Sequence, residues 1–324
     1  MIKKVSFFIL ISLIFSSFFI KKIDYNKSYS YALYATNGAL LDAKVSNDGQ
    51  WRFMLSSDTL PEKLVKSLIV FEDIRYPLHH GVDVWAMIRA FYLNVKNKKI
   101  ISGGSTITMQ VARLYFNSKE RSVIQKIKEM AFALILEQRM SKTEIIKLYL
   151  ENAPFGGNVI GAEAASWRYF GRPLKTLSWA ENAMLAVIPN NPANVNLLKN
   201  RNKLKEKRNL LLKKLYHFNI IDKQTYELSL EEDIPEITID YPHNAPHLLQ
   251  FLISKYPNSY VLHSTVNENL QIETYQILKR YKKDFNANNI RNAATMIVNI
   301  HTGNILAYIG NYHEKGNHTD AFSV

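Results

Sequence analysis

Residues 57–73, SDTLPEKLVKSLIVFED, decide how the largest part of this chain folds. Asp58 or Thr59 can cap the start of a helix there, and Pro61 suits its first turn. Apolar residues recur at positions 60, 64, 65, 68 and 69, which is the spacing of one helix face. The stretch therefore predicts an amphipathic helix that ends near Glu72, whose carboxylate follows an apolar segment.

Further helices are predicted on the C-terminal side of this stretch. They are indicated by two capping-box pairs, Ser141 with Glu144 and Ser178 with Glu181, by Pro189 after the second pair, and by helical periodicity over residues 200–216 and 223–231. Successive helices with few strand signals between them are typical of a helical layer around one core. Residues 57–231 are therefore expected to form one mainly α domain.

Strand patterns flank the helical region on both sides. Before it, residues 29–53 alternate short apolar runs with Asn37-Gly38 and Asp48-Gly49, which are pairs typical of hairpin turns. After it, a Pro-rich connector precedes residues 293–312, AATMIVNIHTGNILAYIGNY, which predict two strands around a tight turn at residues 302–304. Because two strands alone are marginal, this part is expected to be the beginning of a further domain.

The N-terminal segment predicts a membrane anchor. Val5–Ile20, VSFFILISLIFSSFFI, contains no charge and is flanked by lysines at positions 3, 4, 21 and 22. A cleaved signal peptide is the competing interpretation, but no A-x-A-like cleavage site follows Ile20 closely. We therefore expect an uncleaved single-pass anchor, with Met1 in the cytoplasm and everything after Lys22 exported.

The composition limits the classes of protein that remain. The 324 residues allow two globular units, and 47% hydrophobic residues with 21% charged residues exclude a disordered chain. The absence of cysteine excludes disulfide scaffolds, thiolate metal sites and a cysteine nucleophile. The net charge of +13 favours an anionic partner. Beside a membrane anchor, this charge favours lipid headgroups or a lipid-linked phosphate over nucleic acid.

Two glutamates are candidates for acid–base chemistry. Glu72 follows an apolar segment, where desolvation would raise its pKa toward that of a general base. A solvated helix end, with His79 in the following loop, is the competing interpretation. Glu129 shares a helix face with Lys126, away from an apolar stripe that begins at Val123. An ordinary surface ion pair explains the second spacing equally well.

Between the two glutamates stands the segment ISGGSTITMQVAR, residues 101–113. Two glycines allow a tight turn, and Ser105 or Thr106 then starts a helix whose free N–H groups and dipole favour an anion. Arg113 adds a positive group two turns later. A capped helix without a ligand explains the string alone, but with the anchor and the two glutamates it suggests a membrane-bound pyrophosphate substrate. The chain shows no dedicated metal-cage spacing and no nucleotide-binding glycine motif.

Five motifs in this region occur in a fixed order. They are EDIRYPLHHGVD (72–83), SGGSTITMQVAR (102–113), KIKEMAFALILE (126–137), SKTEIIKLYLENAPFGG (141–157) and AASWRYFGRP (164–173). The set resembles the peptidoglycan glycosyltransferase domains, family 51 of the glycosyltransferases, at the front of class A penicillin-binding proteins. The strings APFGG, TMQVAR and DGQWRF resemble the 1C type of these proteins.

The resemblance implies a role for each matching residue. Glu72 matches the general base that deprotonates the acceptor 4-hydroxyl, and Glu129 matches a second glutamate linked to the departing lipid pyrophosphate, directly or through a divalent cation, Mg or Mn. Lys126 and Arg113 match basic positions near the phosphates, Ser105, Thr106 and Gln110 match the helix-start motif, and Asp73 and His79 match positions that shape the cleft. The implied reaction polymerises lipid II onto a growing glycan chain by inverting transfer, with release of undecaprenyl pyrophosphate, and moenomycin inhibits it. The implied partners are inner-membrane lipid and cell-wall synthesis proteins.

The implied fold is mainly α, with a lysozyme-like, two-lobed glycosyltransferase domain. The expected ranges are a cytoplasmic tip and transmembrane anchor (1–24), a juxtamembrane β-hairpin (25–56), the glycosyltransferase domain (57–231), a linker (232–290) and the incomplete start of a transpeptidase domain (291–324). The catalytic domain is expected on the periplasmic side of the inner membrane. The transpeptidase motif S-x-x-K is expected shortly after Val324, so truncation before the nucleophile is expected and no penicillin-binding serine is identified.

Three positions depart from the family pattern. Tyr76 replaces a usual Phe, Gln125 replaces a common Arg, and Glu151 stands where the family has Asn. Two alternative functions stay open beside the glycosyltransferase. One is a glycan-cleaving hydrolase of the lysozyme or lytic transglycosylase type, because two carboxylates in a helical cleft also suit that reaction. The other is a catalytically weak membrane scaffold for cell-wall synthesis.

Overall fold

The computed structural model describes residues 28–55, 59–99, 103–117, 122–190, 197 and 200–312. The predicted anchor, Val5–Ile20, lies outside these residues. Within them, no helix combines the length and the apolar character that crossing a bilayer requires. The described residues fall into two compact units. The first contains residues from 59–162 and 178–236, and the second contains residues from 28–55, 163–177 and 237–312.

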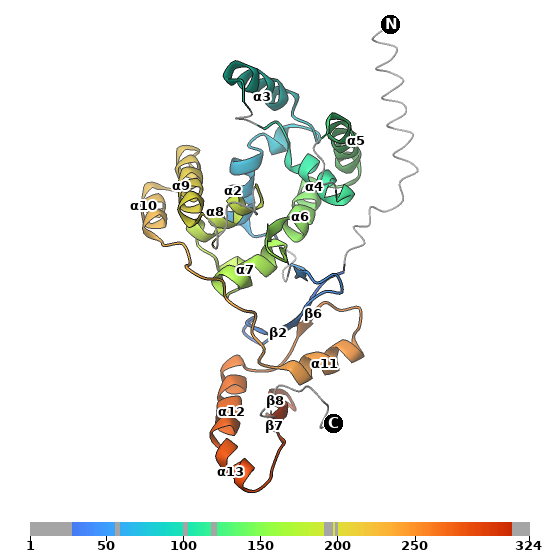
Figure 1. Ribbon diagram of the computed structural model, residues 1–324, viewed down its shortest axis with the longest axis vertical. Helices are drawn as coiled ribbons and strands as arrows, with labels where there is room; N and C mark the ends of the chain where they lie inside the picture. The colour runs from blue at the N-terminus through green and yellow to red at the C-terminus, as the bar shows by residue number, and fades with distance from the viewer. Residues whose placement is uncertain are drawn as a thin grey trace. The chain divides into compact units, whose positions relative to one another are not determined.

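The first unit is mainly helical, as predicted. Its helices are α2 (Glu62–Glu72), α3 (Val84–Asn97), α4 (Ile107–Phe116), α5 (Val123–Arg139), α6 (Lys142–Asn152), α8 (Trp179–Val187), α9 (Arg201–His217) and α10 (Lys223–Glu231). Two short 3-10 helices, η1 (Tyr76–Leu78) and η3 (Ile188–Asn190), and a small antiparallel pair, β4 (Pro154–Gly156) and β5 (Val159–Ile160), complete it. Within this unit α9 and α10 lie on one side of α8, while α4, α5 and α6 pack together (Figure 1).

Local sequence signals explain where several of these helices begin. The capping boxes are present at α6 and α8: each N-cap serine accepts from the backbone N–H three residues on, and that residue's glutamate accepts from the serine N–H. The start of α2 differs from the prediction, because Pro61 is its N-cap residue and no side chain caps it. A residue that precedes proline is driven out of the helical region, so Leu60 prevents a start at Thr59.

The core of the first unit lies around α4 and α8. Ile107, Met109 and Val111 of α4 are completely buried, and almost every residue of α8 is buried as well. A helix that is buried on all sides needs apolar residues on all sides, and the run NAMLAV of α8 meets this requirement. The burial of α4 therefore fixes the positions from which its site residues project.

The second unit is built on a three-stranded sheet that joins distant segments. Its strands are β1 (Tyr31–Tyr34), β2 (Leu40–Lys44) and β6 (Val261–His263), in the order β2-β1-β6. β1 and β2 form the predicted antiparallel hairpin, with Gly38 at φ 80° in the turn. β6 pairs in parallel with β1 although more than two hundred residues separate them. The hairpin therefore belongs to a larger core, in which Leu33 and Leu41 pack with Leu248, Leu249 and Leu262.

The range predicted as a linker contains regular structure. It includes α11 (Pro246–Lys255), β6, α12 (Glu268–Arg280) and α13 (Lys282–Ala287), and the predicted strand pair β7 (Ala293–Val298) and β8 (Ile305–Tyr312) follows. Gln271 of α12 ties these elements together: its side-chain amide donates to Asn244 O and Tyr308 O and accepts from Tyr308 N. α7 (Ala162–Phe170) and η2 (Leu174–Thr176) also belong to this unit, and Ile239 N donates to Arg168 O of α7. The Pro-rich stretch covers residues 235–246, up to the first residue of α11.

Candidate active site

Glu72, the last residue of α2, is the first element of the candidate site. Its Oε2 accepts a hydrogen bond of 2.7 Å from Gln110 Nε2 of α4, and its Oε1 is buried from solvent. Burial raises the pKa of this carboxyl group, and the hydrogen bonds from Gln110 and Asn190 and the charge of Lys207 only partly oppose that effect. Glu72 is therefore a carboxylate with raised proton affinity, and a fully solvated helix end is the wrong interpretation.

Asn190 and Lys207 are site residues that the sequence analysis missed. Lys207 Nζ of α9 donates to Asn190 Oδ1 at 3.3 Å, and both influence the pKa of Glu72. Tyr149 of α6 is also close enough for the charge of Glu72 to raise its pKa, although burial is the larger cause. Only the tertiary structure, which brings η3, α9 and α6 close to Glu72, identifies these three residues, because no local spacing connects them with Glu72.

Asp73 organises the start of α4. Its two carboxylate oxygens each lie 3.0 Å from His79 Nε2, and its Oδ2 accepts from Ile107 N at 3.0 Å. Thr106 is the N-cap residue of α4, accepts from Met109 N and donates to Gly81 O at 2.6 Å. The expectation that this helix start attracts a phosphate needs correction. The anion at the start of α4 is the Asp73 carboxylate of the chain itself.

Gly104 serves a different purpose from the predicted tight turn. A Cβ atom at this position would lie 2.8 Å from the Cα atom of Met87 in α3. Contacts this short do not occur between real side chains and a backbone, so only glycine allows the loop to approach α3 so closely. The GGST string therefore places Ser105 by backbone packing against a neighbouring helix.

Ser105, Arg113, Lys126 and Glu129 form the second part of the site. Glu129 accepts from Arg113 Nε at 2.7 Å, from Arg113 Nη2 at 3.1 Å and from Lys126 Nζ at 2.8 Å. Lys126 Nζ also donates to Ser105 Oγ at 2.7 Å. Glu129 is only 2% exposed. The surface ion pair considered from the sequence is therefore wrong, and we call these four residues the basic cluster.

The pKa values in the basic cluster follow from this burial and pairing. Burial alone would raise the pKa of Glu129, but the hydrogen bonds and charges of Arg113 and Lys126 outweigh it and leave that pKa lowered. Burial also lowers the pKa of Lys126, which Glu129 partly restores. With two cations and one carboxylate, the cluster carries a net positive charge at neutral pH.

The apolar stripe of α5 lies on the opposite side from the one expected. Val123, Ile124 and Ile127 are exposed, whereas Glu129 faces the protein interior. The helix is buried along Phe132, Ala133, Ile135 and Leu136 instead. The first two turns of α5 therefore present apolar side chains to the surroundings.

α4 joins the two parts of the site. Gln110 holds Glu72 and Arg113 holds Glu129, and residues three apart on a helix project from the same face. The two glutamates consequently lie beside one turn of a buried helix, one as a carboxylate of raised proton affinity and the other paired with cations. All nine residues predicted for the site belong to this arrangement.

The described residues contain no cluster of three or more His, Cys, Asp or Glu side chains that could hold a metal ion. Both oxygens of Glu129 already accept hydrogen bonds from Arg113 and Lys126. This donor set does not fit a dedicated metal site, because a divalent cation would have to replace two positive charges at one carboxylate.

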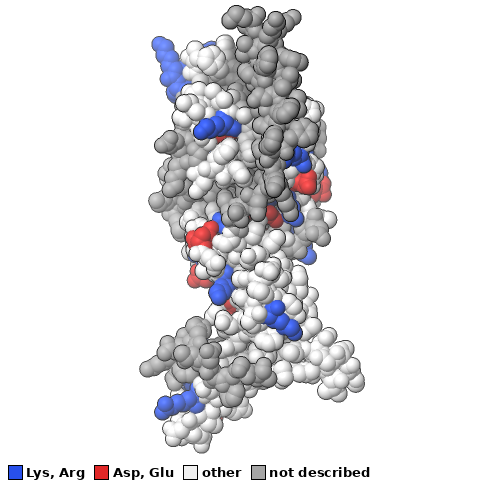
Figure 2. Space-filling view, turned by 90° about the vertical axis from the view of Figure 1, so that its right-hand side faces the viewer, with Lys and Arg blue, Asp and Glu red and all other residues white. Residues whose placement is uncertain are grey.

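The distribution of charged side chains on the surface does not help to locate the site. On the face seen in Figure 2, the described basic and acidic side chains lie scattered among uncharged ones. The net charge of +13 is therefore not gathered into one patch on that face. The local cluster around Glu129, and not a broad basic surface, is the feature that suits an anionic group.

These features define a mainly helical domain with two glutamates held beside one helix, α4, and comparison with known proteins gives its family. The sequence pattern described as Transglycosylase matches residues 37–216, more than half of the chain. The chain therefore belongs to the transglycosylase family, and the predicted enzyme class, peptidoglycan glycosyltransferase, is confirmed at the level of that family.

Individual relatives agree with this assignment. The chain is 36% identical over 223 residues to penicillin-binding protein 1A of Pseudomonas aeruginosa, covering 65% of this chain and 27% of that protein. It is 32% identical over 268 residues to penicillin-binding protein 1C of Escherichia coli, covering 83% and 34% respectively. The chain thus spans about a quarter to a third of the curated relatives it matches. Because 1A and 1C proteins both match, the 1C type stays a prediction.

A solved structure, penicillin-binding protein 1A from Haemophilus influenzae, also matches, at 17% identity and a TM-score of 0.36. The match covers 77% of this chain and 28% of that one. The family assignment rests on the sequence comparisons.

Proposed function

We propose that the chain polymerises lipid II into glycan strands at the outer face of a bacterial inner membrane. The observation that carries this proposal is the arrangement on α4, where Gln110 holds a carboxylate of raised pKa and Arg113 holds a buried basic cluster. A base beside a cluster of positive charge is what transfer from a pyrophosphate-linked sugar requires. The lysozyme-like, two-lobed architecture belongs to the same proposal.

In the proposed reaction Glu72 accepts the proton of the acceptor sugar's 4-hydroxyl. The freed oxygen forms a bond to the anomeric carbon of the growing chain, and the bond from that carbon to the pyrophosphate oxygen breaks. A single displacement inverts the configuration at the anomeric carbon. The raised pKa supports this role, because a general base works best when its pKa approaches the working pH.

The basic cluster would stabilise the charge that develops on the leaving pyrophosphate. Lys126 and Arg113 supply positive charge, and Ser105 fixes the Lys126 ammonium by accepting from it. Glu129 contacts both cations and holds them in one place, so we assign it a positioning role in the cluster. Preorganised charges of this kind cost no rearrangement during the reaction.

The divalent cation stays a proposal that is separate from these steps. Since Glu129 is engaged by two cations, Mg²⁺ or Mn²⁺ would have to arrive with the pyrophosphate, and no step above uses it. Titration of the metal against activity, with EDTA as the zero point, tests this. Equal activity with and without a divalent cation would show that the reaction does not require one.

A membrane location agrees with the surface of α3. The apolar side chains Val84, Trp85, Ile88, Phe91, Tyr92 and Val95 of this helix are all exposed. They recur at helical spacing, and an apolar stripe of this length on a soluble surface marks a contact with lipid or protein. We propose that it faces the bilayer in which a lipid-linked substrate lies. Other cell-wall synthesis proteins stay proposed partners of the whole protein.

Incubation of the purified chain with labelled lipid II and Mg²⁺ tests the proposal. We expect moenomycin-sensitive polymer, separated by length on a gel. No polymer in several detergents and in lipid vesicles would count against it and would favour the catalytically weak scaffold.

The same preparation tests the hydrolase alternative. Intact sacculi would release soluble muropeptides if the two glutamates cleave glycan. A hydrolase has no need of the basic cluster, so we expect no release. Release of muropeptides without any polymer from lipid II would reverse the assignment.

A further inference from the structure

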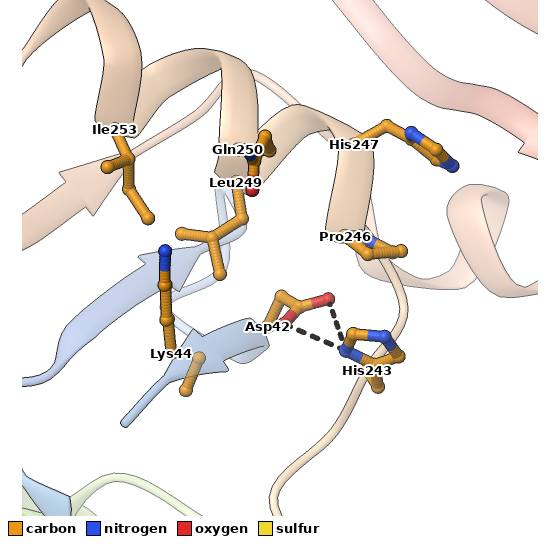
Figure 3. A pocket seen from close by; sticks show the side chains of 9 residues that line it. Asp42, Lys44, His243, Pro246, His247, Leu249, Gln250 and Ile253 are labelled. Atoms are coloured by element: carbon orange, nitrogen blue, oxygen red, sulfur yellow. Dashed lines mark hydrogen bonds and ion pairs between the residues drawn. The ribbon is translucent and has the colours of Figure 1, made fainter. Parts of the chain in front are cut away.

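A pocket in the second unit lies outside the candidate active site. It has a volume of about 460 Å³, and residues from β2, from the segment before α11 and from α11 itself surround it (Figure 3). Asp42, Lys44 and His243 supply its charged groups, Gln250 a polar one, and Leu249 and Ile253 an apolar wall. None of these residues has a part in the proposed glycosyl transfer.

The Asp42–His243 pair is the fixed part of this pocket. Asp42 is completely buried, its Oδ1 lies 3.1 Å from His243 Nδ1, and its Oδ2 accepts from Ala245 N at 3.2 Å. The carboxylate is thus held from two sides, and it holds the imidazole in turn (Figure 3). The hydrogen bond to Asp42 raises the pKa of His243, so this ring stays cationic to higher pH than an isolated histidine.

Lys44 provides a second cation at the end of β2. Its ammonium makes no hydrogen bond or ion pair within the part of the chain that the structure describes, and its side chain extends along Leu249 (Figure 3). The third basic side chain at the pocket, His247, points away from the Asp42–His243 pair (Figure 3). When His243 is protonated, Asp42, His243 and Lys44 sum to one net positive charge.

The charge and the apolar wall together select the ligand. One net positive charge matches a monoanion, and a phosphate dianion would meet the buried carboxylate of Asp42. Leu249 and Ile253 offer apolar surface beside the cations, which a free inorganic anion would not use. We propose that this pocket binds the C-terminal carboxylate of a peptide whose last side chain is aliphatic, with Lys44 and His243 on the carboxylate.

Fluorescence anisotropy of the full chain tests this proposal. The probe is the peptide Gly-Gly-Leu, labelled at its N-terminus and bearing a free carboxylate, and the comparison is the same peptide with a C-terminal amide. We expect the amide to bind about tenfold more weakly, because charged hydrogen bonds are lost. Equal binding of both peptides, or no binding of either, would overturn the proposal.

Variants then assign the binding to the pocket. Lys44→Gln should weaken the binding of the free-acid peptide about tenfold. Lys279→Gln, which removes an exposed lysine from α12 in the same unit, should leave the affinity unchanged. Circular dichroism and thermal unfolding establish that each variant is folded. Normal binding by a folded Lys44→Gln protein would exclude the pocket.

The pH dependence separates His243 from general electrostatic attraction. In the unmodified chain, peptide affinity should fall as the pH rises through the raised pKa of His243, since the ring loses its charge. His243→Gln should bind more weakly at pH 6 and should show no such fall. A fall that persists in the folded variant would contradict the role of His243. Displacement of the peptide by inorganic phosphate at lower concentrations than by acetate would overturn the choice of a carboxylate.

Discussion

At the scale of single residues, the two glutamates differ because their partners differ. Glu72 is desolvated and receives its one short hydrogen bond from a neutral amide, Gln110, whereas Glu129 is desolvated but paired with Arg113 and Lys126. The same burial therefore raises the pKa of one carboxyl group and fails to raise the other. Replacement of each glutamate by glutamine should therefore change the free energy of unfolding in opposite directions.

Glu72→Gln should lower polymerisation about 100- to 10,000-fold, the usual loss for a general base. It should also increase the free energy of unfolding at pH 7, because a carboxyl group whose pKa is raised on folding makes the ionised native state less stable. The gain should vanish as the pH falls well below about 4.3, the ordinary pKa of glutamate, because the carboxyl group is then protonated in both states. Lipid II turnover and urea unfolding at several pH values measure the two effects.

Glu62→Gln is the matched control for this prediction. Glu62 lies on the same helix, is exposed, and pairs with Lys66. It should alter neither polymerisation nor the unfolding free energy at pH 7 by much. If Glu72→Gln polymerised lipid II at a near-normal rate, Glu72 could not be the base.

Glu129→Gln should act in the opposite direction on stability. Pairing keeps the pKa of Glu129 lowered. The ionised side chain therefore stabilises the folded protein at neutral pH, and this stabilisation is lost as the pH falls below the ordinary range of glutamate. Removing the charge should cost about 2 kcal/mol at pH 7 and much less near pH 3. Urea unfolding at both pH values checks this, and a stabilised variant at pH 7 would contradict the assigned pairing.

Glu129→Gln and Lys126→Ala should resemble each other in activity, since both disturb the basic cluster. If a divalent cation accompanies the pyrophosphate, their defects should change with its concentration, whereas the Glu72→Gln defect should not. Initial rates across a Mg²⁺ titration measure this. The same Mg²⁺ dependence in all three variants would contradict the separate roles of Glu72 as the base and of the basic cluster as the pyrophosphate site.

At the scale of elements, α3 and the first turns of α5 are unusual because they expose their apolar residues. Helices of a soluble domain usually turn such residues toward the core. Here the buried side of α5 carries Glu129, which pairs with Arg113 and Lys126. The exposed apolar residues of α3 are those for which contact with a bilayer is proposed above.

A dye attached to α3 tests that contact. The natural chain has no cysteine, so Phe91→Cys provides a single labelling site for an environment-sensitive fluorophore. The emission should shift to shorter wavelength when phospholipid vesicles are added. Leu228→Cys on α10, a position of similar exposure, serves as the control and should show no shift. Equal responses at both positions would argue against a specific contact through α3.

At the scale of the whole molecule, the second unit is assembled from three separate stretches of sequence. β1 and β2 come from the N-terminal part of the described chain, α7 from the middle, and β6 and α11 from the C-terminal part. The first unit holds every residue of the candidate active site and contributes none to the sheet of β1, β2 and β6. The two units should therefore respond differently to loss of the C-terminal segment.

A chain ended at Glu236 tests this separation. It lacks β6 and α11, so β1 loses a neighbouring strand and Leu33 and Leu41 lose their packing partners. Hydrogen exchange at Ala32 and Leu33 should become fast, while the amides of α4 and α8 stay protected. Persistent protection of β1 would show that the hairpin is stable without the C-terminal segment.

The sequence by itself determined the features that depend on neighbours within one turn. The capping boxes at Ser141 and Ser178, the helices α9 and α10, and the strand pair β7–β8 all follow from residues close together in the chain. The motifs also named the residues that the structure brings together around α4, and their roles in the reaction stay predictions. Local chemistry was sufficient in each case.

Only the tertiary structure decided which groups meet. It placed Asp73 at the start of α4 where a phosphate was expected, brought Asn190 and Lys207 beside Glu72, and buried Glu129. It also paired β1 with β6 across the length of the chain. Burial, pKa and long-range strand pairing depend on the neighbours that packing supplies, and these neighbours are distant in the sequence. A periodic pattern shows that a helix has two faces, but the packing of the other elements determines which face is buried.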